Sequence, residues 1–489
     1  MLTPYFEPNL ISMLNKLIVI VFFSCLSLHG QGLIGTLLQE QQGMQSNHER
    51  HTVQCGSHFL SLHQDQLTPG YLEASNETLK QTVNRIQNGQ KTTNTPIVVP
   101  VVFHIVYNDS TENLPDTVIT QQLQSLNNNF GRRNADTSNL RNEFVPYVGN
   151  PNIQFELATL DPNGNPTTGI VRKSTSISYF GGTLPYGPNQ TAQIQQWVLD
   201  SLFYNFSRIS QDSLGGSSPW DTERYLNIWV GDLRIFEPLF NNFEEIAFLG
   251  FAMPKAGHPN FAGTGIDSLL THPGAIMHHM AIGPNNPTAF PPPYGNFNTI
   301  SSEGDLLSHE VGHFLGLRHI WGDGDCSADD YISDTPLSNN SNQFSCNKQR
   351  NTCIDSIGGL NLPDMVENFM DYSSDACMNT FTQEQALVMR NTLMVFFPGI
   401  YAVGATEHVL MNDLRCYPNP TAGSLRITSD SPWQDAEVQV LNSSGIEVLN
   451  RPLPNHTSTM ELELTGPAGL YFVRVLGRQS ERTFKVLKQ

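Results

Sequence analysis

The pattern of hydrophobic and polar positions changes abruptly near residue 96. Residues 31–95 are polar, rich in Gln, Asn, His and Thr, and show little periodicity. The β-branched run Pro96–Tyr107 has the composition of a strand, and Val118–Phe130 places its apolar residues on one side of a helix. Further strands are expected at Ile153–Leu160, Tyr225–Val230 and Gly274–Ile282. We interpret the adjacent His278 and His279 as ordinary residues of the last strand.

A second helical pattern surrounds residue 310. Leu307, Val311 and Phe314 recur at helical spacing, which predicts a stripe that faces the core. Ser302 and Asp305 resemble a capping box at the start of this segment. We therefore expect a helix across this part of the chain.

A third pattern begins after a change of composition at residues 402–414. Short alternating segments follow, including Val438–Val448 around a Ser-Ser-Gly turn, Gly469–Val475 and Phe484–Lys488. Alternation over short segments separated by turns predicts a small β-sandwich of all-β class. We place a linker at residues 402–413 and a C-terminal domain at residues 414–489.

The N-terminus has the pattern of an export signal. Lys16 precedes the apolar stretch Leu17–Leu28, which has the length of the hydrophobic region of a signal peptide. We assign residues 1–30 to this signal, with Met13 as a possible true start, and residues 31–95 to a pro-segment. Because no later apolar run reaches 18 residues, no transmembrane anchor is expected.

Length and charge narrow the class of protein further. A chain of 489 residues is too long for one core and suggests two or three domains. Its 26 basic and 45 acidic residues give a net charge of −19. Such a charge disfavours nucleic acid and anionic membranes as partners.

Candidate chemistry lies in the helical pattern around residue 310. His309 and His313 are four residues apart, so on a helix both can hold one ion. Glu310 lies beside the first of them, where it can hold and deprotonate a metal-bound water. Gly316 can adopt a left-handed conformation and end the helix, after which His319 can supply a third nitrogen. Three imidazoles and one open position describe a catalytic zinc site rather than a closed structural one.

Two other interpretations of these residues were weighed. Lone histidines are mostly ordinary surface or core residues, but this spacing arises by chance on the order of 5 times in 100,000 chains of this length. A catalytically inactive, metal-binding surface or adhesion protein could also keep the ligands. Glu310 is present together with all three histidines, which favours an enzyme.

The run from His309 to His319 has the signature of the metzincin metalloproteases, and Asn368–Tyr372 resembles their Met-turn. Within that clan, the stretch from His309 through Asp323, the later Asp-Thr-Pro and the segment around the Met-turn resemble the pappalysin family. The resemblance implies an α+β catalytic domain at residues 96–401, with a twisted mixed sheet, a zinc helix and a loop-rich lower subdomain. The small β-sandwich follows it.

The resemblance also implies a function and a role for each residue. The protein is expected to be a secreted zinc endopeptidase that hydrolyses peptide bonds through a zinc-bound water, with Glu310 as general base. His309, His313 and His319 hold Zn²⁺. Met370 forms an apolar floor beneath them. Tyr372 hydrogen-bonds the oxyanion or caps the resting metal, and an ordinary packed aromatic is the alternative. Its substrates are proteins or peptides.

Four cysteines follow the motif, at positions 326, 346, 353 and 377. An even set in an exported protein indicates two disulfides, and the sequence alone allows three pairings. A structural zinc knot is the alternative, but no CxxC pair is present. The resemblance favours Cys326–Cys353 with Cys346–Cys377.

An acidic run from Asp323 to Asp334 raises the question of calcium. It does not have the pattern of an EF-hand, because Ala328 stands where that loop needs glycine. The alternative is a solvated acidic loop. Pappalysins bind structural calcium in this region, and Asp330 and Thr335 fall at the matching places. Ca²⁺ is therefore expected as a second cofactor.

The C-terminal domain resembles the sorting domain of the type IX secretion system, on the segments Tyr417–Thr421, Gly469–Val475 and the terminal Lys-Val-Leu-Lys. This resemblance implies the secretion machinery as a partner and export through the periplasm and outer membrane. A carbohydrate-binding module is the alternative, but no aromatic platform stands out. We assign no function to Cys416.

Two expectations concern regulation and specificity. Cys55, followed by Gly56, lies in the polar pro-segment, and a thiolate is a good zinc ligand. We expect Cys55 to occupy the fourth zinc position in a latent form, until the pro-segment is cut near Arg85 or Lys91. Some pappalysins prefer arginine at P1′ through an acidic residue at a position that is Ala376 here, so this preference is not expected.

Overall fold

The computed structural model describes residues 51–87, 96–184, 192–238, 243–253, 272–289, 303–342, 344–403, 414–429, 436–443, 447–454, 457–476 and 481–489. The expected signal peptide, most of the expected linker, Ser302 and Lys91 lie outside these ranges. Within them, no helix is both long and apolar enough to cross a membrane.

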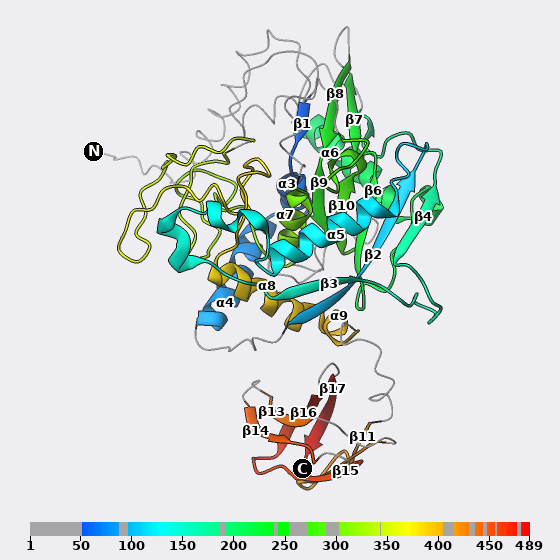
Figure 1. Ribbon diagram of the computed structural model, residues 1–489, viewed down its shortest axis with the longest axis vertical. Coiled ribbons are helices and arrows are strands. Elements are labelled where there is room, and N and C mark those ends of the chain that lie inside the picture. The colour runs from blue at the N-terminus through cyan, green and yellow to red at the C-terminus, as the bar shows by residue number, and fades with distance from the viewer. Residues whose placement is uncertain are drawn as a thin grey trace, which may run out of the picture.

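A six-stranded mixed sheet forms the centre of the catalytic part (Figure 1). Its long strand β2 pairs in parallel with β3 and β4 along one edge and with β6 along the other, and β9 closes the sheet as an antiparallel edge strand. The strands are β2 (Ile97–Tyr107), β3 (Ile153–Leu157), β4 (Ile170–Ser174), β6 (Leu226–Gly231), β9 (Gly250–Met253) and β10 (Gly274–His278).

Both faces of this sheet are covered, which explains why the interior of β2 is almost continuously apolar. On one face lie α5 (Asp116–Phe130), α7 (Asp305–Phe314) and α8 (Gln383–Phe396), with side chains such as Ile105 and Met277. On the other lies α6 (Ala192–Ser207), with Val106 and Ile276. Alternate residues of one strand therefore enter different cores.

The pro-segment is more regular than its sequence suggested. It forms β1 (His51–Val53), α3 (Ser57–Leu67) and α4 (Tyr71–Gln87). β1 joins a second sheet with order β1-β8-β7-β5, made with β8 (Phe243–Phe248), β7 (Arg234–Pro238) and β5 (Gly182–Thr183). Short helices in a polar segment gain most of their stability from packing, here against the catalytic part. The periodicity of the segment itself therefore does not predict them.

The observed elements adjust several expected boundaries. The helix expected at Val118–Phe130 begins at Asp116, the strand expected at Ile153–Leu160 ends at Leu157, and β10 ends at His278. After β10 the chain enters a 3-10 turn, so His279 is not a strand residue. The short 3-10 segments are Ala135–Asn139, Asn142–Tyr147, Arg208–Ser210, Asp212–Leu214 and His279–Ala281.

The expected capping box at the start of α7 is wrong. The N-cap is Gly304, with φ of 80° and no side chain to accept a hydrogen bond. The carboxylate of Asp375 instead accepts hydrogen bonds from the backbone N–H groups of Glu303 and Gly304, at 3.0 and 3.1 Å. A residue distant in sequence thus replaces the local cap.

The segment between α7 and α8 contains few regular elements and two disulfides. Cys326 is bonded to Cys353 and Cys346 to Cys377, the pairing that the resemblance implies. They close loops with sequence separations of 27 and 31 residues. Loops of this length restrict the unfolded chain by on the order of 3–4 kcal/mol each. α9 (Pro398–Val403) ends the catalytic part.

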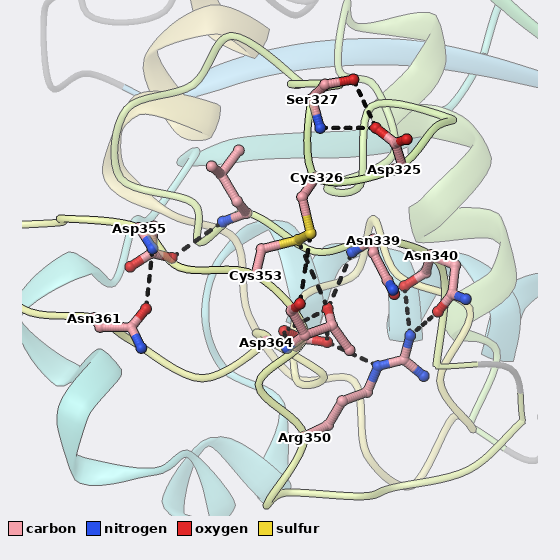
Figure 2. Close-up of a disulfide and its surroundings, with 12 residues drawn as sticks. Asp325, Cys326, Ser327, Asn339, Asn340, Arg350, Cys353, Asp355, Asn361 and Asp364 are labelled. Atoms are coloured by element: carbon pink, nitrogen blue, oxygen red, sulfur yellow. Dashed lines mark hydrogen bonds and ion pairs between the residues drawn. A yellow bond between two sulfur atoms is a disulfide. The ribbon is translucent and has the colours of Figure 1, made fainter.

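Figure 2 shows how side chains stabilise this irregular region around Cys326–Cys353. Arg350 donates from Nε to the Asp364 carboxylate at 2.7 Å, and the backbone N–H of Thr352 donates to the same carboxylate at 2.9 Å. The Thr352 hydroxyl accepts from the N–H of Asn339 at 3.0 Å. Hydrogen bonds from side chains thus take the place of a ladder between strands.

The C-terminal strands form two antiparallel sheets with a core of their own (Figure 1). One sheet contains β11 (Arg415–Tyr417), β12 (Ser424–Thr428) and β15 (Thr459–Glu463). The other contains β14 (Glu447–Pro452), β13 (Glu437–Asn442), β16 (Gly469–Leu476) and β17 (Glu481–Lys488). The predicted fold class, an α+β catalytic part followed by a small β-sandwich, is confirmed.

Candidate active site

Helix α7 presents two histidines from a position inside the core. Every residue from Asp305 to Phe314 is buried, because the helix lies between the central sheet, α5 and the irregular segment between α7 and α8. The helix ends at Phe314, and Gly316 has φ of 98°, a left-handed conformation that favours glycine. The reversal brings His319 back toward the helix.

The three imidazoles converge on one point. Nε2 of His313 lies 3.1 Å from Nε2 of His309 and 3.1 Å from Nε2 of His319. Ligand atoms bound tetrahedrally to one Zn²⁺ at about 2.0–2.1 Å would be separated by about 3.3 Å. These two separations are close to that value, and all three nitrogens lie within 4.8 Å of one another.

A second set of contacts fixes which ring nitrogen faces this point. Nδ1 of His309 donates to the carbonyl of Phe369 at 2.7 Å, and Nδ1 of His313 donates to the carbonyl of Leu317 at 2.9 Å. Nδ1 of His319 is hydrogen-bonded to the Asp323 carboxylate. Since each Nδ1 carries the proton, each Nε2 keeps a lone pair for a metal.

Burial also favours neutral imidazoles. It lowers the pKa of His309 well below the usual value and lowers that of His313 to about 3, with the neighbouring His319 acting in the same direction. Neutral imidazole is the form that binds metal. The residues present therefore fit a zinc ion at this position.

Met370 packs closely against α7 because the helix has a glycine at position 312. A Cβ at Gly312 would lie only 2.4 Å from Sδ of Met370. Met370 is fully buried, and the preceding Phe369 supplies the carbonyl that holds His309. This turn thus packs against α7 and supplies one hydrogen-bond acceptor to His309.

The pro-segment reaches the centre of this site. Cys55 is 1% exposed, and its sulfur, together with the three imidazoles, belongs to one group of possible ligand atoms within 4.8 Å of one another. Its thiol donates to Oε2 of Glu310 at 3.5 Å. The hydroxyl of Tyr372 donates to the carbonyl of Cys55 at 3.3 Å.

The backbone beside Cys55 runs close to the central sheet. The N–H of Gly56 donates to the carbonyl of Gly250 at 2.9 Å, and a Cβ on Gly56 would lie 3.1 Å from the Phe248 ring. The N–H of Ser57 donates to the Cys55 sulfur at 3.3 Å. Burial, with the Glu310 carboxyl adding to it, raises the pKa of the Cys55 thiol, so binding as thiolate requires a cation at the imidazoles.

One pocket, of about 290 Å³, borders the site on the side of His319. Trp321 stacks on the His319 ring, with centroids 4.3 Å apart, and lines this pocket together with Tyr372 and Asp323. His58 and Phe59 of the pro-segment form part of its wall. Removal of the pro-segment would therefore widen this pocket.

The acidic run does not act as one cluster. Asp323 holds His319, whereas Asp325 accepts from the backbone and hydroxyl of Ser327. Asp330 and Thr335, the residues expected at calcium, are both buried and lie together, with the Thr335 hydroxyl 2.8 Å from Oδ1 of Asp330. Burial raises the pKa of Asp330 well above the usual value.

The structure adds residues that the sequence analysis did not single out for these roles. Asp323 and Gly312 support the ligands, and Asp375 caps the zinc helix. Arg318, inside the motif, donates to the Ser75 hydroxyl of α4 at 2.9 Å and so ties the pro-segment to the catalytic part. For Asp323 a signal was available, because an acid four residues after a ligand is a common partner for its second nitrogen.

Comparison with known proteins decides the family. Residues 290–394 match the peptidase M43 family, described as Pregnancy-associated plasma protein-A. A mutant promirolysin of Tannerella forsythia is 32% identical, with a TM-score of 0.51, and the match covers 72% of this chain and 96% of that one. The chain belongs to the pappalysin family of metalloproteases.

Two further relatives extend the comparison. Mature mirolysin of Tannerella forsythia in complex with a cleaved peptide is 32% identical to this pappalysin-family protein, with a TM-score of 0.46, over 63% of this chain and 99% of that one. An extracellular metalloprotease of Arthroderma otae is 37% identical over 106 residues, 22% of this chain. That match spans 37% of the fungal relative's length.

The end of the pappalysin-family protein belongs to a different family. Residues 415–489 match the secretion system C-terminal sorting domain. This range coincides with the β-sandwich that begins at β11. With a sorting domain and extracellular metalloproteases among its relatives, the protein is a secreted one.

Proposed function

We propose that this protein is a secreted zinc endopeptidase that is made as a latent zymogen. The convergence of three imidazoles, Glu310 and the thiol of a pro-segment supports both parts of this proposal. Residues 31–95 would form the pro-segment, residues 96–401 the catalytic domain and residues 414–489 the sorting domain. The natural substrates would be extracellular proteins or peptides.

His309, His313 and His319 would hold the zinc ion. Once bound, Zn²⁺ supplies Lewis acidity for a scissile carbonyl and lowers the pKa of water toward about 7. The protein's contribution is to hold the three rings rigidly. The carbonyls of Phe369 and Leu317 and the carboxylate of Asp323 do so, as the hydrogen bonds to Nδ1 indicate.

Glu310 would act as the general base and acid. Its carboxylate is buried next to His309 on α7, and burial raises its pKa well above the usual value. A base of raised pKa accepts a proton from the attacking water readily at neutral pH. Glu310 would then pass this proton to the leaving amine.

Tyr372 and Met370 would support the reaction without exchanging protons. The Tyr372 hydroxyl now donates to the Cys55 carbonyl. In the mature enzyme the same hydroxyl could donate to the oxyanion that develops on the substrate carbonyl. Met370 keeps the underside of the site apolar and dry, because its side chain fills the space over Gly312.

Latency would result from the position of Cys55. As a thiolate, Cys55 would take the fourth position on zinc and exclude the water that the reaction needs. The same segment is hydrogen-bonded to Glu310 and Tyr372. One piece of chain would therefore block the metal, the base and the oxyanion donor together. Cleavage near Arg85 or Lys91 would release it.

Two finer proposals concern calcium and specificity. Asp330 and Thr335 would bind a structural Ca²⁺, an ion that prefers carboxylate and other oxygen ligands. A preference for arginine at P1′ is not expected. Ala376 supplies no charge, and the neighbouring Asp375 is fully buried, with its carboxylate bonded to the start of α7.

A casein digest tests the proposal. The protein freed of its pro-segment should degrade casein, lose this activity in the presence of a chelator, and regain it when Zn²⁺ is restored. An inactive adhesion protein with the same fold would bind zinc but degrade nothing under either condition. Absence of chelator-sensitive proteolysis would therefore refute the enzymatic function.

A further inference from the structure

A second group of buried ligand atoms lies at one edge of the central sheet. Strands β6 and β10 run parallel, with Gly231 opposite His278. Because the carboxyl ends of parallel strands meet at the same edge, Asp232, which follows β6, is brought beside His278 and His279 at the end of β10. Neither histidine takes part in the proposed proteolysis.

The three side chains are close and buried. One ligand atom from each lies within 4.8 Å of the others, and Nε2 of His278 is 3.5 Å from Oδ1 of Asp232. Asp232 and His279 are 1% and 2% exposed, and His278 is fully buried. The two imidazole rings stack with centroids 4.9 Å apart.

His279 gives the second observation. Among the residues that the structure describes, neither ring nitrogen of His279 has a hydrogen-bond partner. A buried polar group without a partner is unfavourable, and native proteins rarely keep one without a ligand, water or function. His104 shows the usual alternative, since both of its ring nitrogens are bonded, to Ser217 and Asn227.

The local charge suits a cation. Burial lowers the pKa of His278 to about 3 and that of His279 to about 4, so both imidazoles are neutral. Although burial alone would raise it, the hydrogen-bonded guanidinium of Arg234 helps to hold the pKa of Asp232 below its usual value. From the loop after β2, Glu112 faces the group, and burial together with Asp232 raises its pKa to about 7.

A purely structural ion pair is the competing explanation. Arg234 donates from Nε to both carboxylate oxygens of Asp232, at 3.0 and 2.8 Å. This pair accounts for Asp232 but leaves the buried nitrogens of His279 unexplained. Carboxylates that bind metals are themselves commonly hydrogen-bonded, so Arg234 is compatible with a metal as well.

We propose that Asp232, His278 and His279 bind a second divalent transition-metal ion, with Zn²⁺ as the best match. Two imidazoles and one carboxylate form a nitrogen and oxygen donor set typical of zinc. The ion would join the ends of β6 and β10. Alternation along β10 places His278 on the opposite face from Met277, which packs toward α7, so this site is distinct from the catalytic one.

Metal analysis of the intact latent chain tests this proposal. After removal of metal with a chelator and reconstitution with Zn²⁺, we expect about two zinc ions per chain, since each site binds one. His279→Leu should retain about one zinc ion, at the catalytic site. His313→Ala should lose that ion and retain the ion at the second site. The His313→Ala result keeps the two sites distinguishable, because the second ion should remain even if the catalytic proposal fails.

Two more variants protect the test against misfolding. Asp232→Asn preserves the shape of the side chain and an acceptor for Arg234. It should weaken binding of the second ion roughly tenfold or more. His104→Phe removes another buried histidine and should leave the zinc count unchanged. An equal zinc count in the unmodified protein, His279→Leu and Asp232→Asn would overturn the proposal, as would the loss of all zinc in His313→Ala.

Discussion

The thiol of Cys55 donates a hydrogen bond of 3.5 Å to the carboxylate of Glu310, a residue 255 positions further along the chain. The backbone carbonyl of Cys55 accepts from Tyr372 at 3.3 Å. The pro-segment therefore contacts the proposed base and the proposed oxyanion donor through a single residue. This contact is the structural basis of the proposed latency.

Replacing Cys55 should activate the zymogen early. In Cys55→Ala the fourth metal position opens to water, so proteolysis by the uncut chain should rise roughly tenfold or more, equivalent to about 1.4 kcal/mol of lost inhibition. Self-cleavage of the pro-segment should also be faster, as followed by gel electrophoresis. Cys416→Ala, which removes the other free cysteine of the described part of the chain, is the matched control. If the Cys55→Ala zymogen is as inactive as the unmodified zymogen, the proposed thiol switch is wrong.

Loss of the base should separate metal binding from catalysis. In the mature protein Glu310→Ala should keep its zinc, because Glu310 is not a ligand, but should lose roughly 100- to 10,000-fold in rate. His313→Ala should lose both zinc and activity. Zinc content and peptide hydrolysis measured on the same samples would check this. A rate above a few per cent of normal in Glu310→Ala would contradict the assigned role.

Much of the fold around the site could be predicted because it depends on local spacing. The four-residue interval between His309 and His313 places both on one face of any helix, and Gly316 permits the reversal that returns His319. The apolar run of β2 likewise predicts a strand buried on both faces. These features need no information about distant residues.

The rest could not be predicted because it depends on contacts between distant segments. The cap of α7 comes from Asp375, about seventy residues later, in place of the expected local box. The helices α3 and α4 of the pro-segment follow from docking, as in the contact of Ser75 with Arg318. The meeting of Asp232 with His278 and His279 depends on the order and register of β6 and β10.

Asp323 should matter for zinc although it does not touch the metal position. Its carboxylate orients His319 through Nδ1, so Asp323→Ala should weaken zinc affinity roughly 10- to 100-fold. Asp325→Ala is the matched control, because Asp325 is exposed and, among the described residues, its carboxylate is bonded within its own turn, to Ser327. Competition with a chromophoric chelator would measure both affinities. Equal affinities in the two variants would exclude the orienting role.

Stability should fall as pH rises above neutrality. Burial raises the pKa of Asp375 to about 8, whereas an unfolded aspartate titrates near about 3.9. The folded state thus binds this proton more tightly, so the contribution of Asp375 to the free energy of unfolding decreases from about pH 4 to about pH 8. The pKa of His278 is lowered to about 3. Its contribution to the free energy of unfolding therefore increases as pH rises, and this increase is complete by about pH 6.5.

Thermal melts between about pH 6.5 and 8.5 cover the window in which Asp375 loses its proton. The melting temperature of the unmodified protein should decline across it. Asp375→Asn keeps an acceptor for the N–H groups of Glu303 and Gly304 but cannot ionise, so its decline should be smaller. Parallel pH profiles for the two proteins would show that the proton on Asp375 does not affect stability.

Deleting the β-sandwich should block export without preventing the catalytic part from folding. The catalytic part and the sandwich have separate hydrophobic cores, and all residues proposed for the zinc site precede residue 373. A chain that ends near residue 407 should therefore accumulate in the periplasm, bind zinc and keep its two disulfides. A full-length chain with the exposed pair Arg426–Glu461 replaced by alanines should still be exported. Cell fractionation would locate both proteins, and normal release of the truncated chain would show that the sandwich is not the export signal.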